Sequence, residues 1–374
     1  MFDFSGNETD VQSPFHASSI QSFRRALMDW YAANRRILPW RETQNPYHIW
    51  VSETMLVQTQ VATVVDYFHR FVQAFPDIFA LAAADLQDVL KLWEGLGYYS
   101  RARNFHKAGK IVVERHGGEV PDDWESFLAL PGVGDYIASA VQSIAFGKPA
   151  AVVDGNVKRV LARIFTNPAP VNGSSAHKIF KVIASDLLDR EDSGTYNQAV
   201  MELGALICRP ANPQCGDCPV SPWCLAFTGD RVRDFPVKIK KSATPHHHLA
   251  VGVVVKNGKF LIVKRPETGL LGGLWEFPGD RIGQNETLEV ACVRILKQTV
   301  GVKVSVCSHL TRIRHAYTHF KITADVFICD WKSNRVRLNG PIDHRWVRPD
   351  ELQHYPFPKS NHKFMPQLME AIIK

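Results

Sequence analysis

The stretch Leu130-Pro131-Gly132-Val133-Gly134-Asp135-Tyr136 decides the fold of the N-terminal half of this 374-residue chain. The residues before it, from Trp124 onward, place apolar side chains at helical spacing, and Pro131 ends that helix. Gly132 and Gly134 permit backbone angles that other residues resist, and Asp135 begins a second helix. The sequence therefore predicts a helix, a tight turn and a second helix whose first N–H groups point outward.

A turn of this kind is suited to bind an anion, because the N–H groups and the helix dipole both favour negative charge. On DNA, such contacts fix the register of a protein but carry no sequence information, so the chemistry has to come from neighbouring side chains. An ordinary connection between two helices has the same pattern. Gly132 and Gly134 are therefore candidate phosphate-binding residues, and the surrounding motifs decide between the two interpretations.

The composition is that of a globular protein. Its basic charge balance permits a polyanionic partner but does not prove one. Hydrophobic residues make up 45% of the chain and charged residues 22%, while the net charge of +7 gives a pI near 9.0. The length predicts two or three domains. The N-terminus lacks the features of a signal peptide, and no apolar run is long enough for a bilayer. We expect an intracellular, soluble monomer with no membrane partner, cytoplasmic and nucleoid-associated if bacterial.

One predicted helix carries a carboxylate on its apolar face. A start signal at Asn45-Pro46 is followed by a stripe at 3.6-residue periodicity, which predicts one long helix with Glu53 inside the stripe. Burial raises the pKa of a carboxyl group, so Glu53 would hold a proton near neutral pH. The alternative is a Glu at the edge of the stripe that reaches solvent. The apolar stripe consists of Trp50, Val57, Val61, Val64, Phe68 and Phe71.

A second carboxylate, Asp154, precedes the helix expected from Asn156 to Phe165. An Asp in this place is most often an N-cap. That role is compatible with a role in a site, because a capping carboxylate accepts N–H bonds that keep it ionised. Lys158, in the same helix, is either a phosphate contact or a solvated residue.

Four cysteines lie close together in the spacing C-x6-C-x2-C-x5-C, in a short loop held by prolines. In an intracellular protein such crowding favours metal ligation over disulfides. Four thiolates indicate a tetrahedral sulfur site with a structural role, and zinc and a 4Fe-4S cluster are both admissible by ligand type. The four residues are Cys208, Cys215, Cys218 and Cys224.

The period of the sequence changes from helix to strand beyond a basic linker at residues 229–247. We expect the histidines at 246–248, where the linker ends, to form a solvated turn. Apolar runs flank Asn257-Gly258, a strong hairpin signal, and an α+β module is predicted at 248–374. The approach at Leu274–Gly279 resembles that of a Nudix box, but Arg294–Gly301 lacks the paired glutamates that bind magnesium. This module should bind and not hydrolyse.

Together these motifs resemble the A/G-specific adenine DNA glycosylases of the MutY family, within the helix-hairpin-helix glycosylase superfamily. The resemblance runs from about residue 20 to near residue 360. In the endonuclease III branch a lysine nucleophile stands at the place of Tyr136, and Tyr cannot form a Schiff base, so the resemblance implies base removal alone. The motifs that carry it are Trp50–Val61, Gly95–Asn104, Leu130–Tyr136, Val153–Val160 and the cysteine loop.

The resemblance implies a multidomain fold: an all-α helix-hairpin-helix glycosylase with an iron-sulfur cluster loop, followed by an α+β Nudix-like domain. It also implies that the cysteines hold a 4Fe-4S cluster in preference to zinc. The expected segments are a disordered 1–19, a glycosylase domain at 20–228, the linker at 229–247 and an 8-oxoguanine-recognition domain at 248–374. Within the glycosylase, a six-helix barrel part spans about 36–146, and the cluster part joins the N-terminal helix to about 147–228.

The implied substrate is double-stranded DNA with adenine opposite 8-oxoguanine or guanine. Glu53 would be the general acid at adenine N7 and Asp154 would stabilise the oxocarbenium sugar, which agrees with the need for one protonated and one ionised carboxyl group. By the same resemblance Tyr136 and Asn156 support the pocket. The other implied contacts are Arg41 and Glu202 near the extruded base, Gln58 and Tyr98 in the duplex, and Tyr317-Thr318-His319 at 8-oxoguanine, where the family has Phe-Ser-His.

Two departures from the family pattern bear on recognition. Val57 stands where Gln is common, although the helical phase puts it on the apolar face, and Tyr317-Thr318 replaces Phe-Ser. Three other interpretations stay open. The first is an endonuclease III-like pyrimidine-lesion glycosylase. The second is a Nudix-type hydrolase fused to a DNA-binding module, an interpretation that the missing glutamates oppose. A non-catalytic iron-sulfur DNA-binding protein is opposed by the presence of both Glu53 and Asp154.

Overall fold

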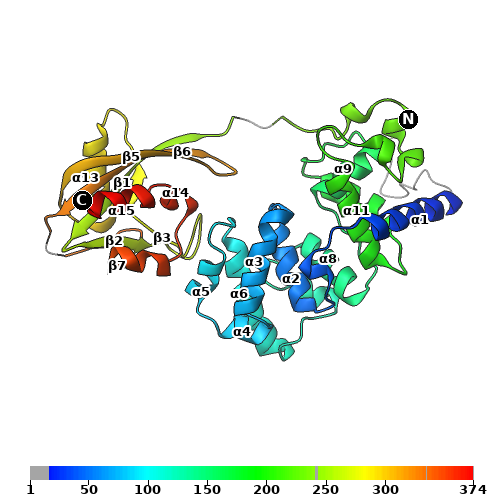
Figure 1. Cartoon of the computed structure of the whole chain (residues 1–374), viewed down its shortest axis with the longest axis horizontal. Helices are drawn as coiled ribbons and strands as arrows, with labels where there is room; N and C mark the ends of the chain where they lie inside the picture. The colour runs from blue at the N-terminus through cyan, green and yellow to red at the C-terminus, as the bar shows by residue number, and fades with distance from the viewer. Residues whose placement is uncertain (1–16, 241–242, 334, 374) are drawn as a thin grey trace. The chain divides into compact units, whose positions relative to one another are not determined.

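The computed structural model describes residues 17–240, 243–333 and 335–373 (Figure 1). The expected disorder at 1–19 falls largely outside these residues, and α1 begins at Ala17. The chain divides into two compact units. Unit 1 comprises Met1–Val72 and Ile111–Lys241, and unit 2 comprises Gln73–Lys110 and Ser242–Lys374. No helix in the described ranges has the length and apolar character needed to cross a membrane.

Unit 1 is helical. Its core packs α1, α9, α10 and α11 around apolar side chains such as Phe23, Leu27, Phe180 and Leu187. Helices α3 and α6 begin in one unit and end in the other. The α-helices of unit 1 are α1 Ala17–Asn34, α2 Pro46–Leu56, α3 Val61–Ala74, α7 Trp124–Leu128, α8 Asp135–Phe146, α9 Gly155–Ile164, α10 Ala176–Leu187, α11 Ser193–Leu206 and α12 Leu225–Thr228. Short 3-10 helices cover Pro39–Arg41, Cys215–Asp217, Ser221–Trp223 and Val232–Asp234.

The prediction of one long helix after Asn45-Pro46 is wrong, because α2 ends at Leu56 and α3 begins at Val61. Gln58 lies between them with a φ of 59°, a left-handed value that a continuous α-helix does not allow. The apolar period hid the break because α2 is buried on nearly all sides, from Ile49 to Met55, and so has no single stripe. Val57 is the residue after α2 and is only half-buried, so the helical phase assigned to it was also wrong.

Unit 2 contains one seven-stranded sheet, in the order β3-β2-β1-β6-β5, with β4 paired to β1 and β7 to β2. The predicted hairpin at Asn257-Gly258 is confirmed by the antiparallel pairing of Val255 with Phe260, whereas β1 and β6 are parallel. The strands are β1 His246–Lys256, β2 Lys259–Lys264, β3 Trp275–Glu276, β4 Gly279–Arg281, β5 Val304–Ala316, β6 Lys321–Trp331 and β7 Asp343–Val347.

Helices cover both faces of this sheet. On one face α13, capped by the Thr287 side chain, packs its apolar residues against strand residues such as Val254 and Phe327. On the other face the C-terminal segment packs Phe364 and Leu368 against Val253 and neighbouring strand residues. The helices of unit 2 are α4 Ile78–Ala83, α5 Leu86–Leu92, α6 Ser100–His116, α13 Leu288–Val300, α14 Lys359–His362 and α15 Met365–Ile373, with a 3-10 helix at Pro349–His354.

The segment from Gln73 to Lys110 is joined to the rest of unit 2 by polar contacts. Glu94 accepts hydrogen bonds from the backbone N–H of Phe357 at 2.6 Å and from the side chain of His362 at 2.8 Å. The indole of Trp275 donates to the Gln87 side chain at 2.9 Å. The corner between α5 and α6 is therefore built together with the C-terminal part of the chain.

Two predictions for residues 229–248 are wrong. Part of the expected linker packs in unit 1, where Phe235 is buried and its carbonyl accepts from Arg163 at 3.0 Å. The polar sequence gave no period there because the segment is held by backbone contacts, including Val171 N to Val237 O at 3.0 Å. The histidines at 246–248 form no turn but begin β1, where they pair with β6.

Candidate active site

Glu53 lies in the middle of α2 and is 4% exposed, so the solvent-reaching alternative does not hold. Helix α2 starts at Pro46 because the Asn45 side chain caps it, accepting from the backbone N–H of Tyr47 at 2.9 Å. Helix α2 packs on α8, which follows the glycine turn and carries Tyr136 as its second residue. The Tyr136 hydroxyl donates to Glu53 Oε2 at 2.6 Å.

Burial raises the pKa of Glu53 to about 7. The hydrogen bond from Tyr136 and the charge of Arg41 lower that pKa, while the negative charge of Asp154 raises it, and desolvation is the largest of these effects. Burial likewise raises the pKa of Tyr136, which therefore remains a neutral donor. A carboxyl group with a pKa near 7 is suited to donate a proton at neutral pH.

Asp154 is the N-cap of α9 and also faces the same cavity as Glu53. Its Oδ1 accepts from the backbone N–H of Val157 at 2.7 Å, and its Oδ2 accepts from the Asn156 side-chain amide at 2.9 Å. Burial raises the pKa of Asp154, and these hydrogen bonds together with the charge of Arg159 oppose that rise. The capping role and a place in the site therefore coexist in one side chain.

A cavity of about 120 Å³ brings the two carboxyl groups together with most of the predicted pocket residues. Its volume is suited to a single small ring system and not to a duplex. Its polar lining consists of Arg36, Arg41, Ser52, Glu53, Thr59, Tyr136, Asp154, Asn156, Gln198 and Glu202.

Glu202 is a buried carboxylate held by two arginines. It accepts from the Arg36 side chain at 2.6 Å and from the Arg41 side chain at 3.0 Å. Although burial alone would raise its pKa, these hydrogen bonds hold the pKa of Glu202 at about 2. Glu202 therefore stays ionised at neutral pH, where Glu53 is close to its pKa. The sequence reasoning missed Arg36, which stands in an ordinary Arg-Arg pair and carries no motif.

The glycine turn opens onto a larger hollow of about 1030 Å³ next to this cavity. Gly132 has a φ of 81°, and Gly134 is the N-cap of α8 without any side-chain cap, so the first N–H groups of α8 have no side-chain acceptor there. A Cβ at Gly134 would meet no atom within 4 Å, which leaves space for an anion. Gln58 and Lys158 line the same hollow.

A second group of predicted residues comes together in unit 2. The Tyr98 hydroxyl and the Thr318 hydroxyl are 2.6 Å apart, and Tyr98, two residues before α6, has a strained φ of 50°. Tyr317 packs against Phe320 with ring centroids 4.8 Å apart and shares a hydrogen bond with Ser360 at 3.0 Å. A cavity of about 420 Å³ is lined by Tyr98, Tyr317, Thr318, His319 and Phe320. The Glu53 cavity belongs to unit 1 and this one to unit 2.

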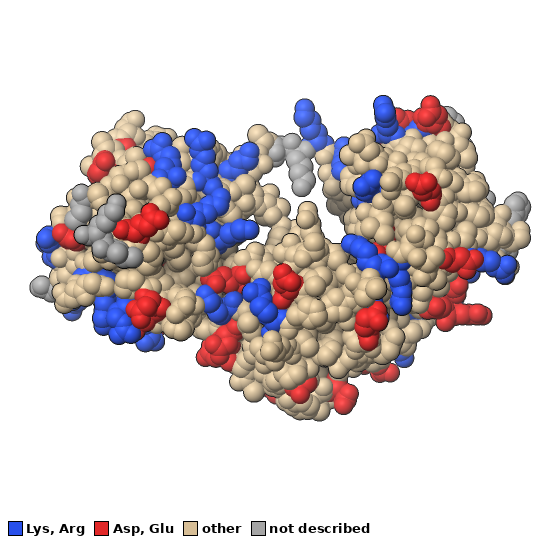
Figure 2. Space-filling view, in the orientation of Figure 1, with Lys and Arg blue, Asp and Glu red and all other residues tan. Residues whose placement is uncertain are grey.

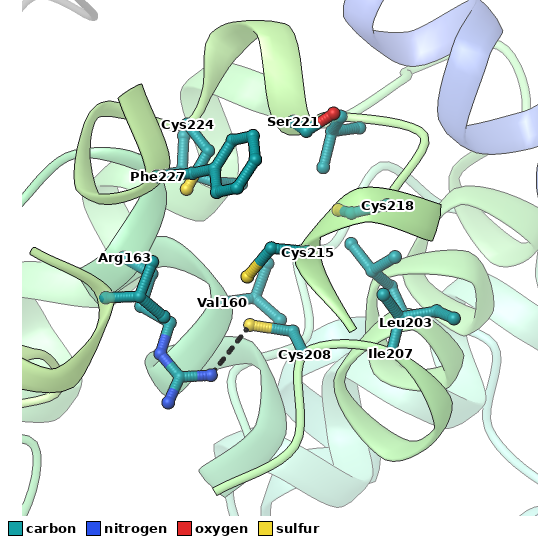
Figure 3. A pocket seen from close by; sticks show the side chains of 13 residues that line it. Val160, Arg163, Leu203, Ile207, Cys208, Cys215, Cys218, Ser221, Cys224 and Phe227 are labelled. Carbon is teal, nitrogen blue, oxygen red and sulfur yellow. Dashed lines mark hydrogen bonds between the residues drawn. The ribbon is translucent and has the colours of Figure 1, made fainter. Parts of the chain in front are cut away.

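The four cysteines line one cavity, where Figure 3 shows their sulfur atoms around a common space walled by Val160, Leu203 and Ile207. Arg163 donates to Cys208 Sγ at 3.3 Å. Burial raises the pKa of Cys218 to about 12, so four thiolates here need a bound cation. The donor set fits a group ligated by four sulfurs. Within the described ranges no three His, Cys, Asp or Glu side chains meet as a compact site for one metal ion.

Comparison with known proteins defines the class. Residues 51–183 match the model of the HhH-GPD superfamily of base excision DNA repair proteins, and residues 250–367 match that of the NUDIX domain. A thermostable thymine-DNA glycosylase has the same fold, with a TM-score of 0.52 and 29% identity over 56% of this chain and 97% of that one. A trapped endonuclease III–DNA intermediate, 23% identical with a TM-score of 0.50 over 58% of this chain and 99% of that one, shows the fold alone.

Curated relatives define the family within that class. The adenine DNA glycosylase of Mus musculus is 36% identical over 84% of this chain and 72% of its own length. The adenine DNA glycosylase of Homo sapiens is 34% identical over 90% of this chain and 72% of its own length. This chain belongs to the adenine DNA glycosylase family. It is a base-excision DNA glycosylase with an endonuclease III-like helical fold and a Nudix-like C-terminal domain.

Proposed function

We propose that this glycosylase hydrolyses the N-glycosidic bond of adenine mispaired with 8-oxoguanine or guanine in double-stranded DNA. The observation that carries the proposal is the pair of carboxyl groups in one cavity, with the pKa of Glu53 at about 7. The relatives that bear the name adenine DNA glycosylase support adenine as the base removed.

Glu53 donates its proton to N7 of the leaving adenine, because a protonated base leaves more readily. Asp154, ionised and oriented by Asn156 and Val157, opposes the positive charge that develops on the sugar. The adenine has to leave the base stack to reach this cavity. Arg41 and Glu202, fixed to each other, line the wall against which the extruded base lies.

Tyr136 positions the Glu53 carboxyl through its hydrogen bond and supplies no amine. A Schiff base with the sugar, and strand cleavage through it, therefore have no nucleophile at this position. The enzyme is monofunctional and leaves an abasic site. Gly132, Gly134 and Lys158 hold phosphates beside the cavity, and Gln58 enters the duplex.

Cys208, Cys215, Cys218 and Cys224 hold a 4Fe-4S cluster, and zinc is the less favoured occupant. The cluster supplies a structural crosslink of the loop after α11, since metal binding and local folding are one equilibrium. Iron, sulfide and zinc analysis of the purified protein tests this part. A zinc-loaded protein without iron contradicts the cluster and leaves the structural role intact.

The C-terminal domain reads the base opposite the adenine through Tyr317, Thr318 and His319, with Tyr98 beside them. It does not hydrolyse nucleotides, because α13 carries Ile295 and Gln298 where magnesium requires carboxylates. We infer a monomer as the acting form, located in the cytoplasm at the nucleoid if the source is bacterial.

The test is incubation with a duplex that contains one 8-oxoguanine:adenine pair, followed by hot alkali, which cuts the strand at abasic sites. Cleavage at the adenine only after alkali is the expected result. Cleavage without alkali contradicts the monofunctional assignment. A parallel duplex with an oxidised pyrimidine serves as control, and cleavage of that duplex alone points to the pyrimidine-lesion alternative.

A further inference from the structure

Beyond the end of α13, one face of the sheet in unit 2 is open and basic. On this face the side chains of Arg312, Arg314, Lys321, His246 and His248 are all exposed. These side chains point to the same side of the sheet because their residues are in register across three strands. Thr323 of β6 lies opposite both Arg314 of β5 and His248 of β1, and Lys321 of β6 lies opposite His246 of β1. We call these five residues, with His309, the basic sheet face.

One buried carboxylate beneath the basic sheet face holds two of its side chains by hydrogen bonds. Asp325 is 1% exposed and accepts from Arg312 Nε and from His309 Nε2, both at 2.9 Å. His246 is held by the Thr323 hydroxyl, also at 2.9 Å. Asp325 is the one acid at the named positions of β1, β5 and β6, and its charge is matched by Arg312. The neighbouring strand β4 adds Asp280, which pairs with Ala250 on the same face, so Arg314 and Lys321 remain as an excess of positive charge.

The next two positions on the same face of β6, Phe327 and Cys329, are covered by α13. Apart from Ala316, the exposed part of this face therefore carries polar and charged side chains. In the space-filling view Lys and Arg gather over the β5 and β6 part of this unit, where Asp and Glu are scarce (Figure 2). Lys363, whose ammonium donates to the carbonyl of Arg314, adds a further positive charge at the same end of β5.

We propose that the basic sheet face binds the phosphate backbone of the DNA duplex on one side of the mispair. Two observations select this occupant. The face carries more basic than acidic side chains, which suits a polyanion, and it continues along β5 and β6 into the loop Tyr317–Phe320 that joins them. Contacts from these exposed cations go to phosphates and do not depend on base sequence.

This inference rests on the proposed function only in that the loop at Tyr317 is taken to lie on DNA. The two differ in what they predict. Base reading by Thr318 sets the ratio of rates on two duplexes, whereas phosphate binding lowers affinity equally for every duplex and changes its dependence on salt.

The experiment compares Arg314→Gln/Lys321→Gln with Lys303→Gln/Lys332→Gln in the full-length protein. The control pair removes the same charge from exposed positions at the opposite end of β5 and β6. Arg312 is left unchanged, because its loss would leave the buried Asp325 carboxylate with His309 alone. Fluorescence anisotropy measures Kd across a range of salt concentrations, on an undamaged duplex and on the same duplex with one 8-oxoguanine:adenine pair.

The test pair is expected to weaken binding to both duplexes about tenfold at low salt and to reduce the slope of log K against log salt by about 2, near 0.9 per lost phosphate contact. The control pair keeps the slope of the unmodified protein. Equal slopes for the two pairs overturn the proposal, and so does weakening on the mispaired duplex alone. Failure of the proposed function is a separate result, namely no adenine release by the unmodified protein.

Discussion

Glu53→Gln is expected to reduce adenine release at least about a hundredfold, because an amide has no acidic proton for the leaving base. Duplex affinity should stay near that of the unmodified protein, since phosphate contacts supply most of it. Single-turnover kinetics and a binding titration measure the two quantities. Glu125→Gln, at an exposed position of α7, is the matched control. Near-normal excision by Glu53→Gln would refute the role assigned to Glu53.

The same substitution has a consequence for stability. The pKa of Glu53 is 4.5 in an ordinary environment and about 7 in the fold, so the folded state binds this proton more tightly than the unfolded state. Stability is therefore greatest below the unfolded pKa and falls as pH rises toward the folded pKa, by up to about 3 kcal/mol. Glu53→Gln removes this loss. Its melting temperature should exceed that of the unmodified protein at pH 8, and equal melting curves there would contradict the raised pKa.

Excision by the unmodified protein should decline as pH rises through about 7, because Glu53 then loses the proton that it donates. In Tyr136→Phe the decline should move to higher pH. Tyr136 donates to the Glu53 carboxylate and so lowers its pKa, and removing the donor makes the ionised form less favourable. The measurement is the single-turnover rate from pH 5.5 to 9 for both proteins. A shift to lower pH would mean that the hydrogen bond favours the protonated form.

At the scale of single elements, Asp154→Asn is expected to lose excision while the fold stays stable. A neutral amide cannot oppose positive charge on the sugar, but its oxygen can still accept from the Val157 N–H and cap α9. The readouts are the excision rate and the melting temperature. Asp123→Asn, at the N-cap of α7, makes the same exchange outside the cavity and should leave excision unchanged. An unfolded Asp154→Asn protein would reduce the role of Asp154 to capping.

Local structure could be predicted from the sequence where a single residue type determines it. The turn at Gly132 and the caps at Asn45 and Asp154 were readable because each depends on backbone angles or on one side-chain acceptor. The break between α2 and α3 was not readable, because its signal is a left-handed Gln58 and no Gly or Pro marks it. Periodicity reports one-sided burial, and α2 is buried nearly all round.

Residues that act through distant partners were also hidden from the sequence. Arg36 reaches Glu202 across 166 positions, and the hydrogen bond between Tyr98 and Thr318 spans 220 positions. Their types fit many roles, and only the fold selects the partner. Glu202 and Thr318 could be named from the sequence only because the family resemblance pointed to them.

At the scale of the whole molecule, residues Gln73–Lys110 cluster with the C-terminal part of the chain, which bears on truncation experiments. A chain that ends near Lys241 retains Glu53, Asp154 and the four cysteines, but it leaves Glu94 and Gln87 without their partners at Phe357 and Trp275. Such a fragment should still remove adenine, with a lower melting temperature than the full chain. Its preference for 8-oxoguanine over guanine should be lost.

Thr318→Ala separates base reading from these packing effects, because Thr318 is exposed and its hydroxyl is 2.6 Å from that of Tyr98. Loss of one hydroxyl contact costs about 1 to 3 kcal/mol, or roughly one to two decades in discrimination. The measured quantity is the ratio of single-turnover rates on 8-oxoguanine:adenine and guanine:adenine duplexes. Thr318→Ser keeps the hydroxyl and should keep the ratio. If Thr318→Ala and the truncated chain both retain the ratio of the unmodified protein, the C-terminal domain has a role other than reading the opposite base.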